Sequence, residues 1–220
     1  MERALRHDVG SEPTRLERAL EHLAEEGAAI TVHPSGTLMA HLRGTYETLS
    51  RWRCPEYLCL AGLYHSVYGT EVFRTATTSP SERDRVRERI GPRAERLVHL
   101  YSTIRRQTLY ENLARGAPYT VVDRATGETL PLGGIEELAD LMTLDVANRL
   151  EQLPRTPMSL RRMEADRRLY ERAVPLLPRA AVEELRRTYR PRALVVILAD
   201  GLLRRVMRLV RRLRGRRHAR

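Results

Sequence analysis

Apolar residues recur every three or four positions over most of the chain, which is the spacing of helices with one buried face. Capping residues, prolines and glycines divide this pattern into segments. Because these segments fill most of the chain, the pattern predicts an all-α helical bundle. We expect helices at 11–27, 37–53, 55–69, 80–90, 92–115 (as one helix or two), 135–153, 158–174 and 179–214, the last interrupted near Pro191.

Three stretches depart from the helical spacing. Residues 28–36 are expected to form an extended connection, and residues 70–78 a loop. Residues 121–132, VVDRATGETLPL, contain two short β-type runs around ATGE, a pattern typical of a β-hairpin. We expect this hairpin to cover one edge of the helical body, with a lid over a pocket as the alternative.

The second and third expected helices carry the candidate chemistry. Their connection at Cys54 is tight, so they should pack as an antiparallel pair. His41 lies 13 residues before Cys54 and His65 lies 11 residues after it, so both imidazoles should meet at the open end of the pair. His33 precedes the pair and could reach the same end. Buried histidines need hydrogen bonds or a metal ion, so they are either satisfied core residues or metal ligands.

Two motifs around these histidines carry a resemblance. The stretches HPSGTLMAHLRGTYETL and LAGLYHSVYGTEVF together resemble an uncharacterised bacterial domain family of HD-like type, over about residues 30–105. More distantly, the interval from His41 to His65 and the segment DVANRLEQL (145–153) are similar to the (p)ppGpp hydrolases of the HD superfamily. The resemblance implies an HD-domain-like bundle, and it implies that His41 and His65 are metal ligands of a phosphohydrolase.

The chain departs from the HD pattern at two positions. Ser66 stands where the aspartate of the His-Asp pair is expected, and Asn148 stands where the later aspartate is expected. Serine and asparagine are neutral and weaker ligands than a carboxylate. We therefore consider His33 and Asp145 as further ligands for a divalent metal ion, namely Mn, Fe or Zn.

Two further residues after His65 could serve the chemistry. Glu71 is a candidate general base or orienting residue, and Tyr68 is a candidate catalytic or substrate-binding residue.

Three functions remain open from the sequence. The first is an atypical metal-dependent enzyme that hydrolyses a phosphorylated small molecule. The second is a di-iron oxygenase, since a fold does not determine a reaction. The third is a non-catalytic module that binds a ligand or partner at a degenerate metal site.

The basic charge of the chain is concentrated at its C-terminal end. All 39 basic residues are arginine, which excludes enzymes that need a lysine Schiff base or a P-loop lysine. Nine arginines and no acidic residue lie in 201–220, which leaves a net charge of +2 for the first 200 residues. We expect an HD-like domain at 1–175 and a basic amphipathic helical extension at 176–220.

This extension has three open interpretations: it packs on the body, lies on an anionic membrane, or contacts RNA phosphates. Aromatic residues that would stack on RNA bases are absent from 190–220. The first 26 residues are highly charged and lack an apolar signal core, and two cysteines are too few for a disulfide framework. We therefore expect a cytoplasmic location, with peripheral membrane contact through the extension as an alternative.

Overall fold

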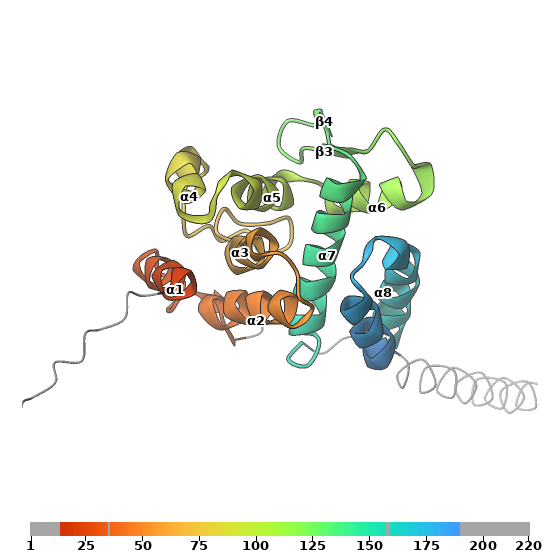
Figure 1. The fold of residues 1–220 in the computed structure, drawn as a ribbon, viewed down its shortest axis with the longest axis horizontal. Coiled ribbons are helices and arrows are strands. Elements are labelled where there is room, and N and C mark those ends of the chain that lie inside the picture. The colour runs from red at the N-terminus through yellow and green to blue at the C-terminus, as the bar shows by residue number, and fades with distance from the viewer. Residues whose placement is uncertain (1–13, 35, 157–158, 190–220) are drawn as a thin grey trace, which may run out of the picture.

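The computed structural model describes residues 14–34, 36–156 and 159–189. The predicted all-α class is confirmed, because strands are confined to two short antiparallel hairpins in the described residues (Figure 1). The helices are α1 (Arg15–Glu25), α2 (Leu38–Arg51), α3 (Glu56–Tyr64), α4 (Arg83–Ile90), α5 (Pro92–Thr103), α6 (Arg106–Arg115), α7 (Ile135–Gln152) and α8 (Leu160–Ala173), with 3₁₀ turns at Pro80–Glu82 and Val174–Leu176. Residues 179–189 are also helical.

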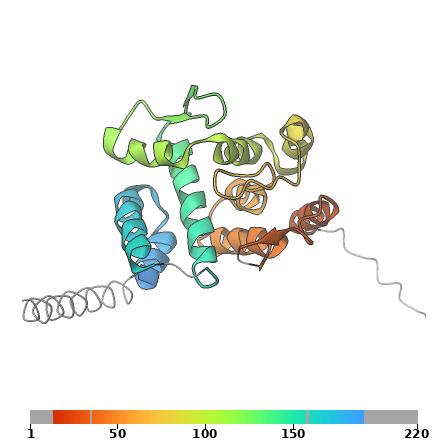
Figure 2. The same cartoon turned by 180° about the vertical axis from the view of Figure 1, so that it is seen from behind.

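Helix α7 runs through the middle of the fold. Helices α2, α3 and α5 lie on one side of it and α8 lies on the other, an arrangement visible from both directions (Figures 1 and 2). Leucine is the most frequent residue of the core, which also contains two fully buried tyrosines, Tyr64 and Tyr101. Because α7 is covered on both sides, polar residues in its middle, Thr143 and Asp145, are buried among other helices.

Helices α2 and α3 form the antiparallel pair that the sequence predicts. Their contact is close at Gly62, where an added Cβ would lie 2.4 Å from Leu49 Cδ1. Helix α3 ends earlier than expected, at Tyr64, because the backbone then turns instead of continuing to residue 69. Gly69 has φ +71° and packs against the Arg74 carbonyl, a conformation that strongly favours glycine.

Both hairpins lie beside helices. The predicted hairpin is present as β3 (Thr120–Val122) paired with β4 (Thr129–Pro131). The segment 92–115 is two helices, because the chain becomes extended at Ile104, which bridges to Asp123. A second hairpin, β1 (Val32–His33) with β2 (Gly36–Thr37), lies where only an extended connection was expected.

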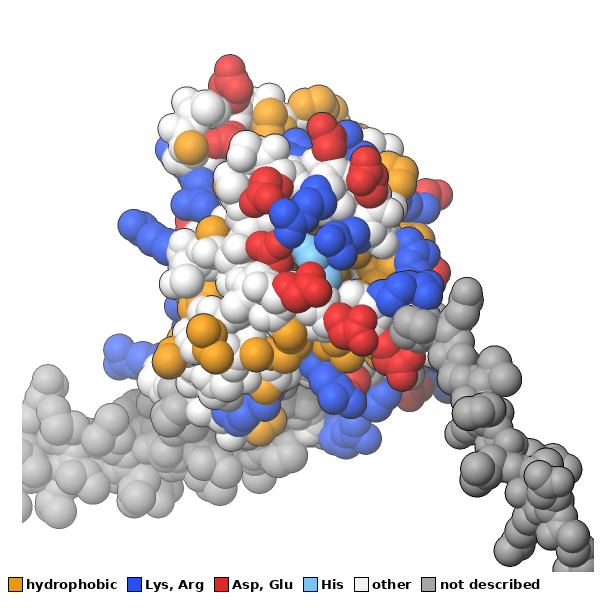
Figure 3. Space-filling view, turned by 90° about the vertical axis from the view of Figure 1, so that its left-hand side faces the viewer, with side chains coloured by type: hydrophobic (Ala, Val, Ile, Leu, Met, Phe, Trp, Pro, Cys, Tyr) orange, Lys and Arg blue, Asp and Glu red, His pale blue; other side chains and the backbone are white. Residues whose placement is uncertain are grey.

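The helix at 179–189 packs into the same core as the preceding helices. Ala181, Leu185 and Tyr189 are buried there, and Trp52 Nε1 donates a hydrogen bond of 2.7 Å to Glu184. The arginine-rich end of the expected extension lies outside the described residues, so its roles stay predictions. No helix in the described part of the chain is long and apolar enough to cross a membrane. The described surface mixes acidic and basic side chains, as one face shows (Figure 3).

Candidate metal centre

His41 and His65 meet at the open end of the α2–α3 pair. His41 lies one turn into α2 and His65 caps the end of α3. Their Nε2 atoms are 3.1 Å apart, and each residue is only 1% exposed. The predicted meeting of the two imidazoles is confirmed, whereas their role as metal ligands stays a prediction.

The other ring nitrogen of each histidine has a partner that fixes its proton. His65 Nδ1 donates to the Gly62 carbonyl at 2.7 Å, and His41 Nδ1 lies 2.5 Å from Glu151 Oε2. A carbonyl only accepts, and a carboxylate is an acceptor when ionised, so both Nδ1 atoms carry the hydrogen in the neutral rings. Both Nε2 lone pairs then face each other, an arrangement that a shared proton or a cation between them would stabilise.

This arrangement fits a metal ion. Metal-binding histidines usually donate their second N–H to a carboxylate or a backbone carbonyl, as both rings do here. Nitrogen ligands about 2.0–2.1 Å from zinc, at angles between 90° and tetrahedral, lie about 2.9–3.4 Å apart. The observed 3.1 Å falls inside that interval. Within the described residues, however, no group of three or more His, Cys, Asp or Glu side chains is placed to hold a metal ion.

Burial favours the uncharged form of these imidazoles. It lowers the pKa of His33 and of His41 to about 4, and it holds the pKa of His65 well below the usual value. Arg155 acts in the same direction on the pKa of His41. The side chain of Asn148 acts in the opposite direction and raises the pKa of His41. At neutral pH, His65 in particular therefore presents a lone pair at Nε2.

Glu151 is the residue at the site that the sequence did not predict. It reaches α2 because residue 44 is glycine: a Cβ there would lie 2.6 Å from Glu151 Oε1. Its side chain is 4% exposed and also pairs with Arg155. The signal in the sequence was the spacing of Asn148, Glu151 and Gln152, which puts three polar residues on one side of a largely apolar helix.

His33 lies at the site but does not point into it. Its ring stacks on that of His41, with centroids 4.2 Å apart and planes at 5°, and its other neighbour is Phe73. The nitrogen lone pairs of an imidazole lie in the plane of its ring, so those of His33 and His41 lie in two parallel planes. His33 therefore covers the face of His41, and its nitrogens are poorly directed to serve as a ligand beside His41 Nε2.

Asp145 has a different environment from the one expected of a ligand. Its carboxylate accepts hydrogen bonds from the hydroxyls of Tyr101 at 2.9 Å, Tyr110 at 2.8 Å and Tyr170 at 3.1 Å. It also pairs with the buried Arg106 guanidinium. Four donors saturate a carboxylate, so Asp145 holds α5, α6, α7 and α8 together rather than facing the histidines.

The two other candidate residues separate. Tyr68 lies away from the histidines, with its hydroxyl 3.4 Å from Glu95 Oε1. Glu71 lies at the cavity, and its Oε2 accepts the backbone N–H of Arg106 at 2.8 Å, at the start of α6. The structure therefore brings five of the six predicted site residues to one cavity and leaves Tyr68 outside it; the five are His33, His41, His65, Glu71 and Asp145.

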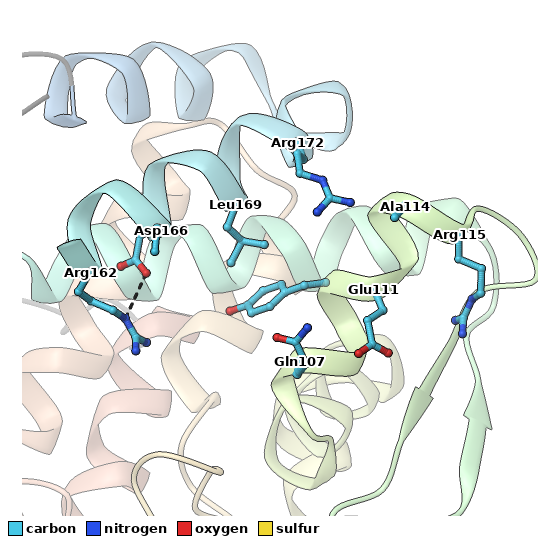
Figure 4. A pocket seen from close by; sticks show the side chains of 10 residues that line it. Gln107, Glu111, Ala114, Arg115, Arg162, Asp166, Leu169 and Arg172 are labelled. Carbon is cyan, nitrogen blue, oxygen red and sulfur yellow. Dashed lines mark ion pairs between the residues drawn. The ribbon is translucent and has the colours of Figure 1, made fainter.

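The histidine pair lines a cavity of about 290 Å³. Ser66 and Asn148 also line it, so the two positions that depart from the HD pattern do face the site. A neighbouring cavity of about 530 Å³ lies between α6 and α8 (Figure 4). The two cavities share Gln107, Tyr110, Arg162, Asp166 and Leu169. The two cavities therefore adjoin along α6 and α8.

Comparison with known proteins gives one match. Residues 22–106 match a domain family of unknown function, DUF6817. The match includes both histidines and Ser66 but ends before α7, so Asn148 and Glu151 lie outside it. No curated protein and no solved structure matches the chain. The site therefore has to be interpreted from its own chemistry.

Proposed function

We propose that His41 and His65 bind a divalent metal ion, and that the protein is a metal-dependent hydrolase of a phosphorylated small molecule with an atypical HD-like site. The observation that carries this proposal is the 3.1 Å approach of two Nε2 atoms whose Nδ1 partners are a carboxylate and a carbonyl. Imidazole suits Mn, Fe and Zn to different degrees, so the test below includes all three.

An ion held by two histidines would keep positions open to water and substrate, and an open position is typical of catalytic rather than structural sites. When bound, the ion would act as a Lewis acid that polarises a phosphoryl oxygen. The protein's contribution is to fix the imidazoles. Glu151 and the Gly62 carbonyl hold their orientation, and burial keeps bulk water from His41 and His65.

The charges on the cavity wall favour an anionic substrate only when a cation is present. Three arginines and three carboxylates line the cavity, so these side chains sum to no net charge. Arg149 and Arg162 both pair with Asp166, which leaves this group of three with a positive excess. Added to a divalent ion, this excess would attract a phosphoryl group.

Glu71 is the candidate base. Among the described residues of the cavity it is the one carboxylate without an ion pair, since Asp145 pairs with Arg106 and Asp166 with Arg149. Its Oε2 is held by the Arg106 backbone, and its other oxygen remains for water. A carboxylate in this position can accept a proton from an attacking water molecule.

Metal analysis of the full-length protein tests the proposal directly. Protein purified after supplementation with Mn, Fe or Zn is compared with His41→Ala and His65→Ala, and His99→Ala is the control because His99 lies on α5 outside the cavity. We expect near-stoichiometric metal in wild type and in the control, and a loss in both site variants. Phosphate release from chromogenic phosphate esters should follow the same order. Wild-type protein without metal above background would refute the proposal.

A non-catalytic binding module is the second candidate, and one observation favours it. Ser66 and Asn148 supply no carboxylate to the site, and Glu151 already holds His41. Metal-free wild-type protein that still binds phosphorylated compounds in the cavity would favour this candidate. Iron retained with an oxygen-dependent spectral change would instead favour an oxygenase.

A further inference from the structure

A chain of hydrogen bonds runs from Asp145 to the histidine pair. Tyr101 bonds Asp145 at 2.9 Å, Asn148 Nδ2 bonds Tyr101 at 2.7 Å, and Gln152 Nε2 bonds Asn148 Oδ1 at 2.7 Å. The chain ends where Gln152 Nε2 lies 3.4 Å from His41 Nε2. Each link joins neighbouring polar groups between the buried carboxylate and the candidate metal centre.

Asp145 imposes the direction of every bond in this chain. An ionised carboxylate accepts only, so the single Tyr101 proton goes to Asp145. The Tyr101 oxygen must then accept, and the Asn148 group that faces it is the NH₂ group. The remaining Asn148 oxygen faces Gln152, so Gln152 also presents its NH₂ group. The amide orientation of Gln152 at the histidines therefore follows from the charge of Asp145, three hydrogen bonds away.

We propose that Gln152 is a hydrogen-bond donor to an oxyanion, such as a phosphoryl oxygen, bound beside the histidine pair. One N–H of Gln152 is used by Asn148, and the second faces His41 Nε2 at a distance too long for a strong bond. This inference rests on the proposed function, because an ion on His41 Nε2 removes the lone pair that the second N–H meets. That N–H then needs another acceptor, and a phosphoryl oxygen is one.

The opposite role, Gln152 as an oxygen ligand of the metal, conflicts with this direction. It would require the amide to turn over and place its NH₂ group away from the Asn148 oxygen. The bond of 2.7 Å to Asn148 would then be lost. Gln152 is therefore a residue that selects the ligand rather than one that binds the ion.

Calorimetric titration with inorganic phosphate tests the inference, in metal-loaded and in metal-free protein. Gln152→Leu keeps the bulk and removes the donor, and it should weaken phosphate binding about five- to tenfold, the change in Kd for one lost hydrogen bond. Gln152→Glu should weaken it at least as much. Gln107→Leu is the matched control, because Gln107 lines the same cavity without contacting either histidine, and its Kd should not change.

Several results would overturn the inference: equal Kd values for wild type and Gln152→Leu, an equal loss in Gln107→Leu, or no phosphate binding by wild type in either form. A Gln152→Glu protein that retains more metal at unchanged phosphate affinity would identify an oxygen ligand instead. The double variant Asn148→Ala/Gln152→Leu tests whether Asn148 acts by orienting the Gln152 amide. It should bind phosphate with the same Kd as Gln152→Leu. A further loss of affinity, equal to that of Asn148→Ala alone, would refute this role of Asn148. If metal-free wild type binds phosphate and Gln152→Leu weakens that binding, the donor role is supported without the metal ion, and metal analysis alone then decides the metal centre.

Discussion

Gly44→Ala should destabilise the protein although alanine is the better helix former. Glycine inside a helix costs about 1 kcal/mol relative to alanine, so the substitution would stabilise α2 if the methyl group had room. The new Cβ would lie 2.6 Å from Glu151 Oε1 and 2.9 Å from Glu151 Cγ. Glu151 must then leave His41 Nδ1, which breaks a charge-assisted hydrogen bond worth about 1.5–3 kcal/mol. We expect a net loss of about 0.5–2 kcal/mol in the free energy of unfolding.

Urea unfolding of metal-free protein measures this loss, and a second background gives the control. In Glu151→Ala protein the obstructing side chain is absent, so Gly44→Ala should there stabilise by about 1 kcal/mol. If Gly44→Ala destabilises the wild-type background and stabilises the Glu151→Ala background, its cost arises from the contact between residue 44 and Glu151. Stabilisation by Gly44→Ala in both backgrounds would refute the reasoning. If the histidines bind metal, the same substitution should also weaken zinc binding about 10- to 100-fold, because it removes the partner that orients His41.

Two further predictions concern stability. Burial lowers the pKa of His33, His41 and His65, so the folded state disfavours their charged forms. Metal-free protein should therefore be most stable above the unfolded histidine pKa of about 6.5. Its free energy of unfolding should decrease as the pH falls toward 4. The urea midpoint should be lower at pH 5 than at pH 7.5, with a smaller difference in His33→Gln, and equal differences would contradict this. Trp52→Phe removes the bond to Glu184 and should cost about 1 kcal/mol. Amide exchange should then accelerate in 179–189 more than in α3, and uniform acceleration would contradict the assigned contact.

The part of the site that could be predicted depends on local geometry. His41 and His65 lie at similar distances from one tight turn, so helix rise alone indicates that they meet. The predicted end of α3 is too late because apolar residues recur at Val67 and Tyr68 before Gly69, while the backbone already turns after Tyr64. The hydrophobic pattern indicates which residues are buried, but buried residues can also follow the end of a helix.

The remaining part of the site depends on contacts between distant segments. Glu151 meets His41 across 110 residues of sequence, and the space for it exists because of Gly44. Asp145 was a reasonable ligand from its position on α7, but its tyrosine partners come from three other helices. No single-segment pattern shows that a carboxylate is already saturated, so such a residue is easily mistaken for a free one.

The saturated carboxylate has a consequence for how this sequence can change over time. Replacing Asp145 alone would leave the Arg106 charge buried without its partner, a strongly unfavourable state. Replacing Tyr101, Tyr110 or Tyr170 alone would remove a donor from the buried carboxylate. Asp145, Arg106 and the three tyrosines should therefore be substituted together among homologues. Homologues in which they differ together would be those whose cavity is lined by different side chains.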